Sequence, residues 1–272
     1  MSREQCESSE PWQSYAAAAA TSGVIVRELL TLEDLHDAAA VLGRIWGTPD
    51  KPPMGAELLR AMVKAESYVA GAFDTEHPEA GLVGVCVGFH SAPAAHAMHS
   101  HIAGVTDAVA GRHVGFALKL HQRAWCLDRG IDVTEWTFDP LVSRNAYFNL
   151  AKLGACVAEY LPDFYGSMTD AINRGNESDR ILVHWSLSSP EVARACAGSP
   201  VRAAVPAGAA ASWVQVPRDV AALRRSDPEE ARAWRTKVRD QLKTALDAGG
   251  RVAGFDKEQG YLVLPPEGDL LP

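Results

Sequence analysis

The chain has 272 residues, of which 47% are hydrophobic and 22% are charged, and its formal net charge is −8. An acidic chain lacks the basic face that neutralises phosphates, so no nucleic-acid partner is expected. No apolar run reaches the roughly 20 residues that cross a bilayer, so no membrane partner is expected. The length supports one large domain with an extension.

Residues 1–23 are rich in Ser, Glu, Gln and Ala. They lack the basic segment and long apolar core of a signal peptide, so we expect a disordered tail. The five cysteines form no locally spaced pair, which favours free or buried thiols in a reducing compartment. The sequence therefore predicts a cytoplasmic protein.

The chain then alternates between strand and helix patterns. Residues 24–30 form a β-rich run, and Thr31 to Asp34 is a capping box that opens a helix. That helix has one apolar face, formed by Leu35, Ala38, Leu42, Ile45 and Trp46. A second helix over 56–64 precedes two strands, 67–73 and 81–90, which we expect to form a hairpin.

A strand containing His99 and His101 runs into a glycine-bearing loop that opens a helix ending at Gly130. Backbone N–H groups of Gly111 to Gly115 would point outward at the positive end of this helix, where an anionic phosphate binds well. Neither a P-loop motif nor a G-x-G-x-x-G motif is present. The alternative is a turn without a ligand.

The next segments are a strand over 131–138, a helix over 145–154 and a strand over 181–187. Residues 188–211 are rich in Ser, Pro, Ala and Gly and indicate a linker. A strand at 213–216, a helix from Asp227 to about Ala248 and a hairpin over 251–264 follow. This last unit is too small for a large core of its own, so we expect it to pack on the preceding domain.

The C-terminal helix carries two arginines one turn apart, Arg235 and Arg239. They either bind a carboxylate or form a solvated helix face. The tryptophans of this unit leave a homodimer contact open as a further possibility.

The order of these elements over residues 24–187 resembles the GNAT superfamily of acyl-coenzyme A N-acyltransferases. Arg112-x-x-Gly115-x-Ala117 fits the loop pattern of this superfamily. Asn145-Ala-Tyr-Phe-Asn149 and Ser178-Asp-Arg180 resemble one poorly characterised branch of its predicted acetyltransferases. The resemblance implies an α/β fold with a mixed central sheet, splayed fourth and fifth strands and flanking helices, plus a small C-terminal helix and hairpin unit. The expected parts are a tail (1–23), an acyltransferase domain (24–187), a linker (188–211) and an extension (212–272).

The resemblance also implies acetyl-coenzyme A or another acyl-coenzyme A as co-substrate. The strand that presents the thioester would polarise its carbonyl through a backbone N–H near Val105. The residues expected to bind the co-substrate are Ala103, Val105, Thr106, Gly111, Arg112, His113, Val114, Gly115, Phe116, Ala117 and Asn145. Three positions depart from the family pattern: Ala110, His113 and Leu150.

Attack by an amine needs a base, and the leaving thiolate is helped by an acid. Leu150 stands where family members often have a Tyr acid, so Tyr147 and Tyr165 are the candidate acids. The candidate bases are His99, His101 and Glu135, while the alternative is that both histidines are half-buried and only hydrogen-bonded. The histidine spacing is not that of a zinc site, so no metal is expected.

The sequence thus predicts an N-acyltransferase that transfers an acyl group, most simply acetyl, from coenzyme A directly to a small-molecule amine in a ternary complex. Succinyl transfer to an amino acid is one alternative. A non-catalytic module that binds acyl-coenzyme A is another, and the three departures favour it.

Overall fold

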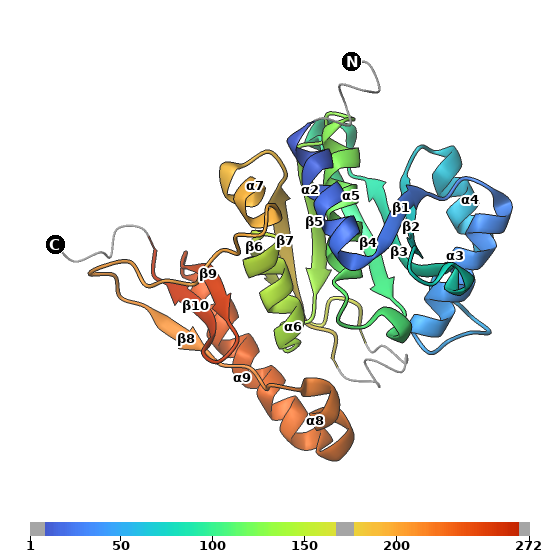
Figure 1. Ribbon diagram of the computed structural model, residues 1–272. Coiled ribbons are helices and arrows are strands. Elements are labelled where there is room, and N and C mark those ends of the chain that lie inside the picture. The colour runs from blue at the N-terminus through green and yellow to red at the C-terminus, as the bar shows by residue number, and fades with distance from the viewer. Residues whose placement is uncertain (1–8, 167–176, 267–272) are drawn as a thin grey trace. The chain divides into compact units, whose positions relative to one another are not determined.

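The computed structural model describes residues 9–166 and 177–266 (Figure 1). The chain forms two compact units, Met1–Thr134 and Glu135–Pro272, and their boundary falls inside strand β5 (Val133–Phe138). Each unit combines strands with helices, so the expected α/β fold class is confirmed.

Unit 1 contains four antiparallel strands in the order β1-β2-β3-β4. Their bounds are β1 Val24–Glu28, β2 Tyr68–Asp74, β3 Leu82–His90 and β4 Ala97–Val105. Short 3-10 turns lie at Pro78–Ala80, Pro93–Ala95 and Asp107–Val109. The helices are α2 (Glu10–Ser22), α3 (Leu32–Ile45), α4 (Ala56–Lys64) and α5 (Val114–Leu127).

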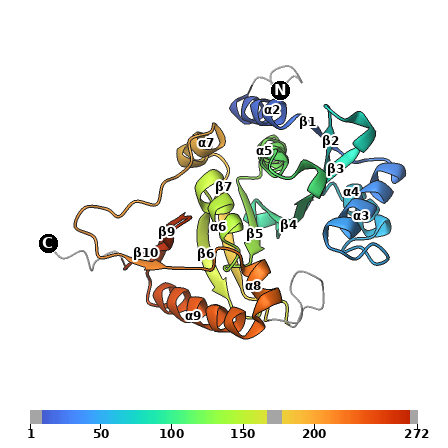
Figure 2. The same cartoon turned by 60° about the horizontal axis from the view of Figure 1, so that its bottom comes forward.

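Helices α3 and α4 lie on one side of this sheet, and α2 and α5 lie on the other (Figures 1 and 2). The capping box is confirmed, because the Thr31 hydroxyl accepts from Asp34 N–H and the Asp34 carboxylate accepts from Thr31 N–H. The apolar face of α3 packs against β3, with Leu35, Ala38 and Leu42 fully buried. Apolar burial of this kind is the main source of the stability of such a helix.

The expected disordered tail is wrong for residues 10–22, which form α2 on the surface of α5. Glu10 forms a two-pronged ion pair with Arg123, and the Trp12 indole donates to Asp128. The Tyr15 hydroxyl donates to the Val26 carbonyl and accepts from the Val26 N–H. An alanine-rich helix is stable here because these side chains hold it to its neighbours.

Unit 2 contains strands β7 (Arg180–Ser186) and β6 (Cys156–Leu161), which pair antiparallel, with β5 next to β7. The predicted helix over 145–154 is a short α6 (Ser143–Ala146) followed by a π-helical segment, η4 (Tyr147–Lys152). The Trp136 and Trp185 rings meet edge to face, and the Trp185 indole donates to the Leu153 carbonyl at 2.7 Å. These contacts fix the turn at Leu153 against the sheet.

The predicted linker over 188–211 contains a helix, α7 (Pro190–Cys196), whose first turn is capped by the Ser189 hydroxyl. The remaining helices are α8 (Val220–Ser226), which the sequence analysis missed, and α9 (Pro228–Asp247), which it predicted with its Asp227 cap. The expected C-terminal strands form a small antiparallel sheet: β8 (Ser212–Val214), β10 (Gly260–Leu264) and β9 (Arg251–Asp256).

This C-terminal part packs on the rest of unit 2, as expected. The Tyr261 hydroxyl donates to the Pro140 carbonyl at 2.8 Å, and both Arg235 and Arg239 pair with carboxylates of the preceding strands. The alternative of a solvated arginine face is therefore wrong, because Arg235 is only 4% exposed. The domain division at residues 187 and 211 stays a prediction.

No helix among the described residues is long and apolar enough to cross a membrane. In the same residues Cys86, Cys126 and Cys196 are buried free thiols, and Cys156 is an exposed one. Cys6 lies outside the described residues.

Candidate functional site

Strand β4 carries the two candidate base histidines, and its pairing with β3 is interrupted at the second of them, His101. Ser100 pairs with Gly88 and Ile102 pairs with Val87, so His101 is an extra residue on β4, a β-bulge. The rings of His99 and His101 lie 6.0 Å apart, and the Phe89 ring lies 5.1 Å from the first and 5.6 Å from the second. The structure thus brings both histidines together on one aromatic surface.

His101 reaches the surface, yet neighbouring groups remove part of its hydration. This burial lowers the pKa of His101 below its ordinary value. A lowered pKa keeps the imidazole neutral at pH 7, which is the state that accepts a proton.

The C-terminal end of β4 lines a cavity of about 360 Å³ in unit 1. Val105 and Thr106 form one wall, and the end of α3 and the start of β3 form others. The Thr106 hydroxyl oxygen is buried and makes no hydrogen bond in the described part of the chain. A buried hydroxyl of this kind is suited to a polar ligand atom.

The loop that follows β4 turns sharply into helix α5. Gly111 has φ +82° and His113 has φ +63°, a left-handed conformation that costs about 1 kcal/mol or more for a residue with a Cβ. A Cβ placed at Gly111 or Gly115 would meet nothing within 4 Å, so there is open space in front of the helix start. The first turn of α5 contains no acidic residue. The N–H groups of Phe116 and Ala117 donate to the His113 carbonyl, so those of Val114 and Gly115 are the ones that a helix start leaves for a ligand. The N-cap residue of α5 is His113, which the sequence did not predict.

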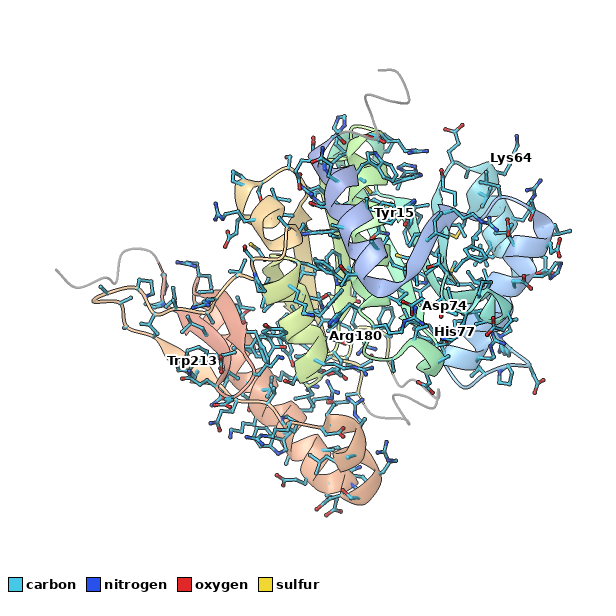
Figure 3. The ribbon with its side chains drawn as sticks, viewed as in Figure 1. Tyr15, Lys64, Asp74, His77, Arg180 and Trp213 are labelled. Atoms are coloured by element: carbon cyan, nitrogen blue, oxygen red, sulfur yellow. The ribbon has the colours of Figure 1, made fainter. Side chains whose placement is uncertain are left out.

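Arg112 turns away from this space. Its guanidinium binds both oxygens of Asp74, lies 3.1 Å from Glu76, and donates to the carbonyls of Ser22 and Gly23. The pairing lowers the pKa of Asp74 to about 2, mainly through the hydrogen bonds from Arg112. Figure 3 shows Asp74 and His77 lying together in this part of unit 1. The Arg112 side chain therefore holds the loop in place through these contacts.

The other candidate site residues of unit 1 occupy the strand end and the helix start. Ala103 is exposed on β4, and Phe116 and Gly115 are half-buried in the first turn of α5. Val114 and Ala117 are buried, so only their backbone groups are available to a ligand.

Two of the candidate catalytic residues, Glu135 and Tyr165, lie on the same side of β5 in unit 2. Glu135 and Thr137 share one face of β5; Glu135 lies 3.5 Å from the His184 imidazole, and the Thr137 hydroxyl lies 3.2 Å from the Tyr165 hydroxyl. The Ser178 hydroxyl accepts from the Tyr165 N–H at 2.8 Å and so orients the Tyr165 loop. The structure places Glu135 and Tyr165 on one side of β5.

Tyr147 lies elsewhere in unit 2, at the start of η4, with the Lys257 ammonium 4.3 Å from its ring centre. Asn145 is half-buried two residues earlier, in α6, and Leu150 is buried. These contacts link Tyr147 to the C-terminal hairpin.

Sequence reasoning missed Asp74 and Phe89. Asp74 meets Arg112 across 38 positions, and no local pattern signals such a contact. Phe89 ends a strand pattern, and only the hairpin register places it beside the histidines.

Comparison with known proteins finds similarity only to solved structures, at low sequence identity. No family model matches the chain, and no curated protein matches it. Among solved structures, an acetyltransferase of the GNAT family from Streptococcus pneumoniae is 13% identical, with a TM-score of 0.48, over 59% of this chain and 97% of its own. The ribosomal-protein-S18-alanine N-acetyltransferase from Escherichia coli is 13% identical, with a TM-score of 0.49, over 61% and 95%.

An IAA acetyltransferase from Bacillus cereus is 18% identical, with a TM-score of 0.43, over 59% of this chain and 97% of its own. All three of these solved structures are named as acetyltransferases. Identities this low describe the fold and do not identify a substrate.

In residues 9–166 and 177–266, no group of three or more His, Cys, Asp or Glu side chains could hold a metal ion.

Proposed function

We propose that the chain is an N-acyltransferase that uses an acyl-coenzyme A, most simply acetyl-coenzyme A, and a small-molecule amine. The observation that carries this proposal is the junction of β4 and α5. The end of β4 lines a cavity of about 360 Å³. The loop that follows contains two residues with left-handed backbone, Gly111 and His113, and leads into the 14-residue helix α5, whose N-terminal end has open space beside Gly111 and Gly115. Such a junction suits an elongated ligand with a diphosphate at one end.

The residues of unit 1 fit this co-substrate. The first turn of α5 would hold the diphosphate through N–H groups of Val114 and Gly115 and through the helix dipole. A backbone N–H near Val105 would polarise the acyl carbonyl, a contribution of about 3 kcal/mol to the barrier. Acyl-coenzyme A supplies the activated acyl group.

His101 is the favoured base for the amine, because burial lowers its pKa and the bulge sets it apart from the regular strand. His99 and Glu135 remain candidate bases, and Tyr165 and Tyr147 remain candidate acids. Direct transfer then forms the amide bond, breaks the thioester bond and releases the thiol as the amine loses its proton.

Calorimetric titration with acetyl-, propionyl- and succinyl-coenzyme A, and with coenzyme A as reference, tests the proposal. We expect micromolar binding with a preference for one acyl chain, which then directs a screen of amines by thiol release. Preference for the succinyl donor would support the succinyltransferase alternative. Binding without turnover of any amine would support the non-catalytic module, and no binding of any of the four would overturn the proposal.

Two variants at one position test the location of the diphosphate. Gly115→Glu places a carboxylate in the first turn of α5, where it stabilises the helix by about 0.3–1 kcal/mol. We expect coenzyme A affinity to fall about tenfold or more, since the carboxylate repels the diphosphate. Gly115→Gln has nearly the same shape without the charge and should retain most of the affinity. Equal affinities for the two variants would contradict this location.

A further inference from the structure

A buried carboxylate in unit 2 forms ion pairs with two arginines. Asp139, directly after β5, accepts through the single oxygen Oδ2 from Arg224 of α8 and, at 2.9 Å, from Arg235 of α9. Both guanidinium groups are about 5% exposed, and Asp139 is 10% exposed. The second oxygen, Oδ1, accepts from the Leu141 N–H at 2.9 Å.

One nitrogen of the Arg235 guanidinium, Nη1, has no hydrogen-bond partner among the described residues. This atom is buried, whereas Nη2 of the same group donates to Asp139. A buried charged donor without an acceptor costs more free energy than an ordinary unmade hydrogen bond. Most buried polar groups in proteins are paired, so such an atom calls for an explanation.

The neighbouring carboxylate of Asp179 cannot supply the missing acceptor. Its Oδ2 accepts from the Tyr160 hydroxyl at 2.6 Å and from Arg239 Nε at 2.8 Å. Its Oδ1 accepts from the Asp163 N–H at 3.0 Å and from Arg239 Nη2 at 2.6 Å. Both oxygens are thus engaged by other donors.

The surroundings of Arg235 favour an anion. Arg180, at the start of β7, is close enough that the charges of Arg235 and Arg224 help burial to lower its pKa. The Arg180 guanidinium also lies 5.2 Å from the centre of the Tyr165 ring, and Tyr165 is 45% exposed. The cluster therefore approaches the protein surface at Tyr165. Arg180, labelled in Figure 3, is itself only 8% exposed.

We propose that Arg235, with Arg180 and Arg224 beside it, binds one carboxylate group of a small organic acid. A planar carboxylate matches the fork of a guanidinium edge and would accept from the unused Nη1. This site lies in unit 2, and none of the contacts that form it belongs to the proposed coenzyme A site of unit 1, so it can be tested separately from the proposed acyl transfer.

Calorimetry and thermal unfolding with succinate as the probe test the site, with succinamide as its uncharged analogue. We expect succinate to bind and to raise the unfolding temperature, and succinamide to do neither. Phosphate and sulfate serve as anions of different shape and should bind more weakly. Equal binding of succinamide, or tighter binding of phosphate or sulfate, would overturn the assignment to a carboxylate.

Substitutions on one helix locate the site. Arg235→Met should weaken succinate binding about tenfold or more, because it removes the charged fork. Arg235→Lys keeps the charge without the fork and should also bind more weakly than the wild type. Arg232→Met, on the exposed side of α9, is the matched control and should bind normally.

Failure of the wild-type protein to respond to succinate, or an unchanged response of Arg235→Met, would overturn the proposal. Far-ultraviolet circular dichroism shows whether each variant is folded, and Arg235→Lys covers the case in which Arg235→Met is not. Titration with acetyl-coenzyme A in the same samples reports on the proposed acyl transfer independently.

Discussion

Arg112 Nη1 lies 2.6 Å from Asp74 Oδ2, and Arg112 Nη2 lies 3.1 Å from Asp74 Oδ1. The same guanidinium reaches the carbonyls of Ser22 and Gly23, so one side chain ties the end of α2, the end of β2 and the loop before α5 together. The ion pair between Arg112 and Asp74 therefore anchors the loop that is proposed to bind a diphosphate.

Asp74→Asn should lower the unfolding temperature at pH 7. The amide keeps an oxygen for the N–H groups of Glu76 and His77 but loses the charge that pairs with Arg112. A lowered carboxyl pKa gives stability that is present above the unfolded pKa of about 4 and is lost as the pH falls to about 2. Thermal unfolding of both proteins between pH 7 and 2 should show curves that converge in acid. A constant difference across this range would contradict the ion-pair explanation.

His113→Gly should leave stability unchanged or raise it by up to about 1 kcal/mol, because glycine adopts a positive φ without strain but also frees the unfolded chain. We expect tighter coenzyme A binding, since glycine removes an imidazole that would crowd a diphosphate bound at the start of α5. Urea unfolding and calorimetry measure the two effects. His113→Ala, which keeps the Cβ strain, is the control for stability. Weaker binding or lost turnover in the glycine variant would instead indicate a working role for the imidazole.

His101→Gln should lower kcat about 100-fold or more if His101 is the base. Burial lowers the pKa of His101, so wild-type activity should hold at pH 7 and decline only below the ordinary histidine pKa, as the imidazole takes up a proton. Thiol release measured against pH gives this profile. His36→Gln on the exposed side of α3 should behave as the wild type. A larger loss in His99→Gln would assign the base to His99.

Tyr15→Phe should destabilise unit 1 by about 1–2 kcal/mol, because it removes two hydrogen bonds to Val26 at 3.0 and 2.9 Å. Ala16→Ser, on the exposed side of α2, should change stability by less than about 0.5 kcal/mol. Chemical unfolding measures both values. A neutral Tyr15→Phe variant would show that α2 is held mainly by Glu10 and Trp12. Figure 3 shows the position of Tyr15 on α2.

Local signals predicted most elements, because local chemistry determines them. Helix α4 spans 56–64 as expected, and α9 begins after the Asp227 cap and ends one residue before Ala248. Helix α2 was missed because its own sequence does not stabilise it; contacts with Arg123 and Asp128, more than 100 positions away, do so. The position of an alanine-rich segment depends on partners that a local pattern does not contain.

The candidate site was predicted unevenly for a similar reason. The glycine-bearing loop and the start of α5 followed from sequence, as did the proximity of His99 and His101. The left-handed conformation of Gly111 and His113 did not. Two further features were not predicted. The bulge at His101 depends on the register between β3 and β4, and the ion pair of Arg112 with Asp74 depends on a long-range contact. Arg235 looked like one of two equivalent surface residues, yet α9 turns it into the interior beside Asp139.

Helix α2 also shields one histidine of α5, His121, from solvent. Trp12 and Tyr15 pack edge to face on the His121 ring, whose Nδ1 lies 2.9 Å from the Tyr68 hydroxyl, and burial lowers the pKa of His121 to about 4. A chain shortened to begin at Val24 would admit water to this imidazole and return its titration to near 6.5. The chemical shift of the His121 ring protons, followed against pH by nuclear magnetic resonance, would then report whether α2 is packed on α5.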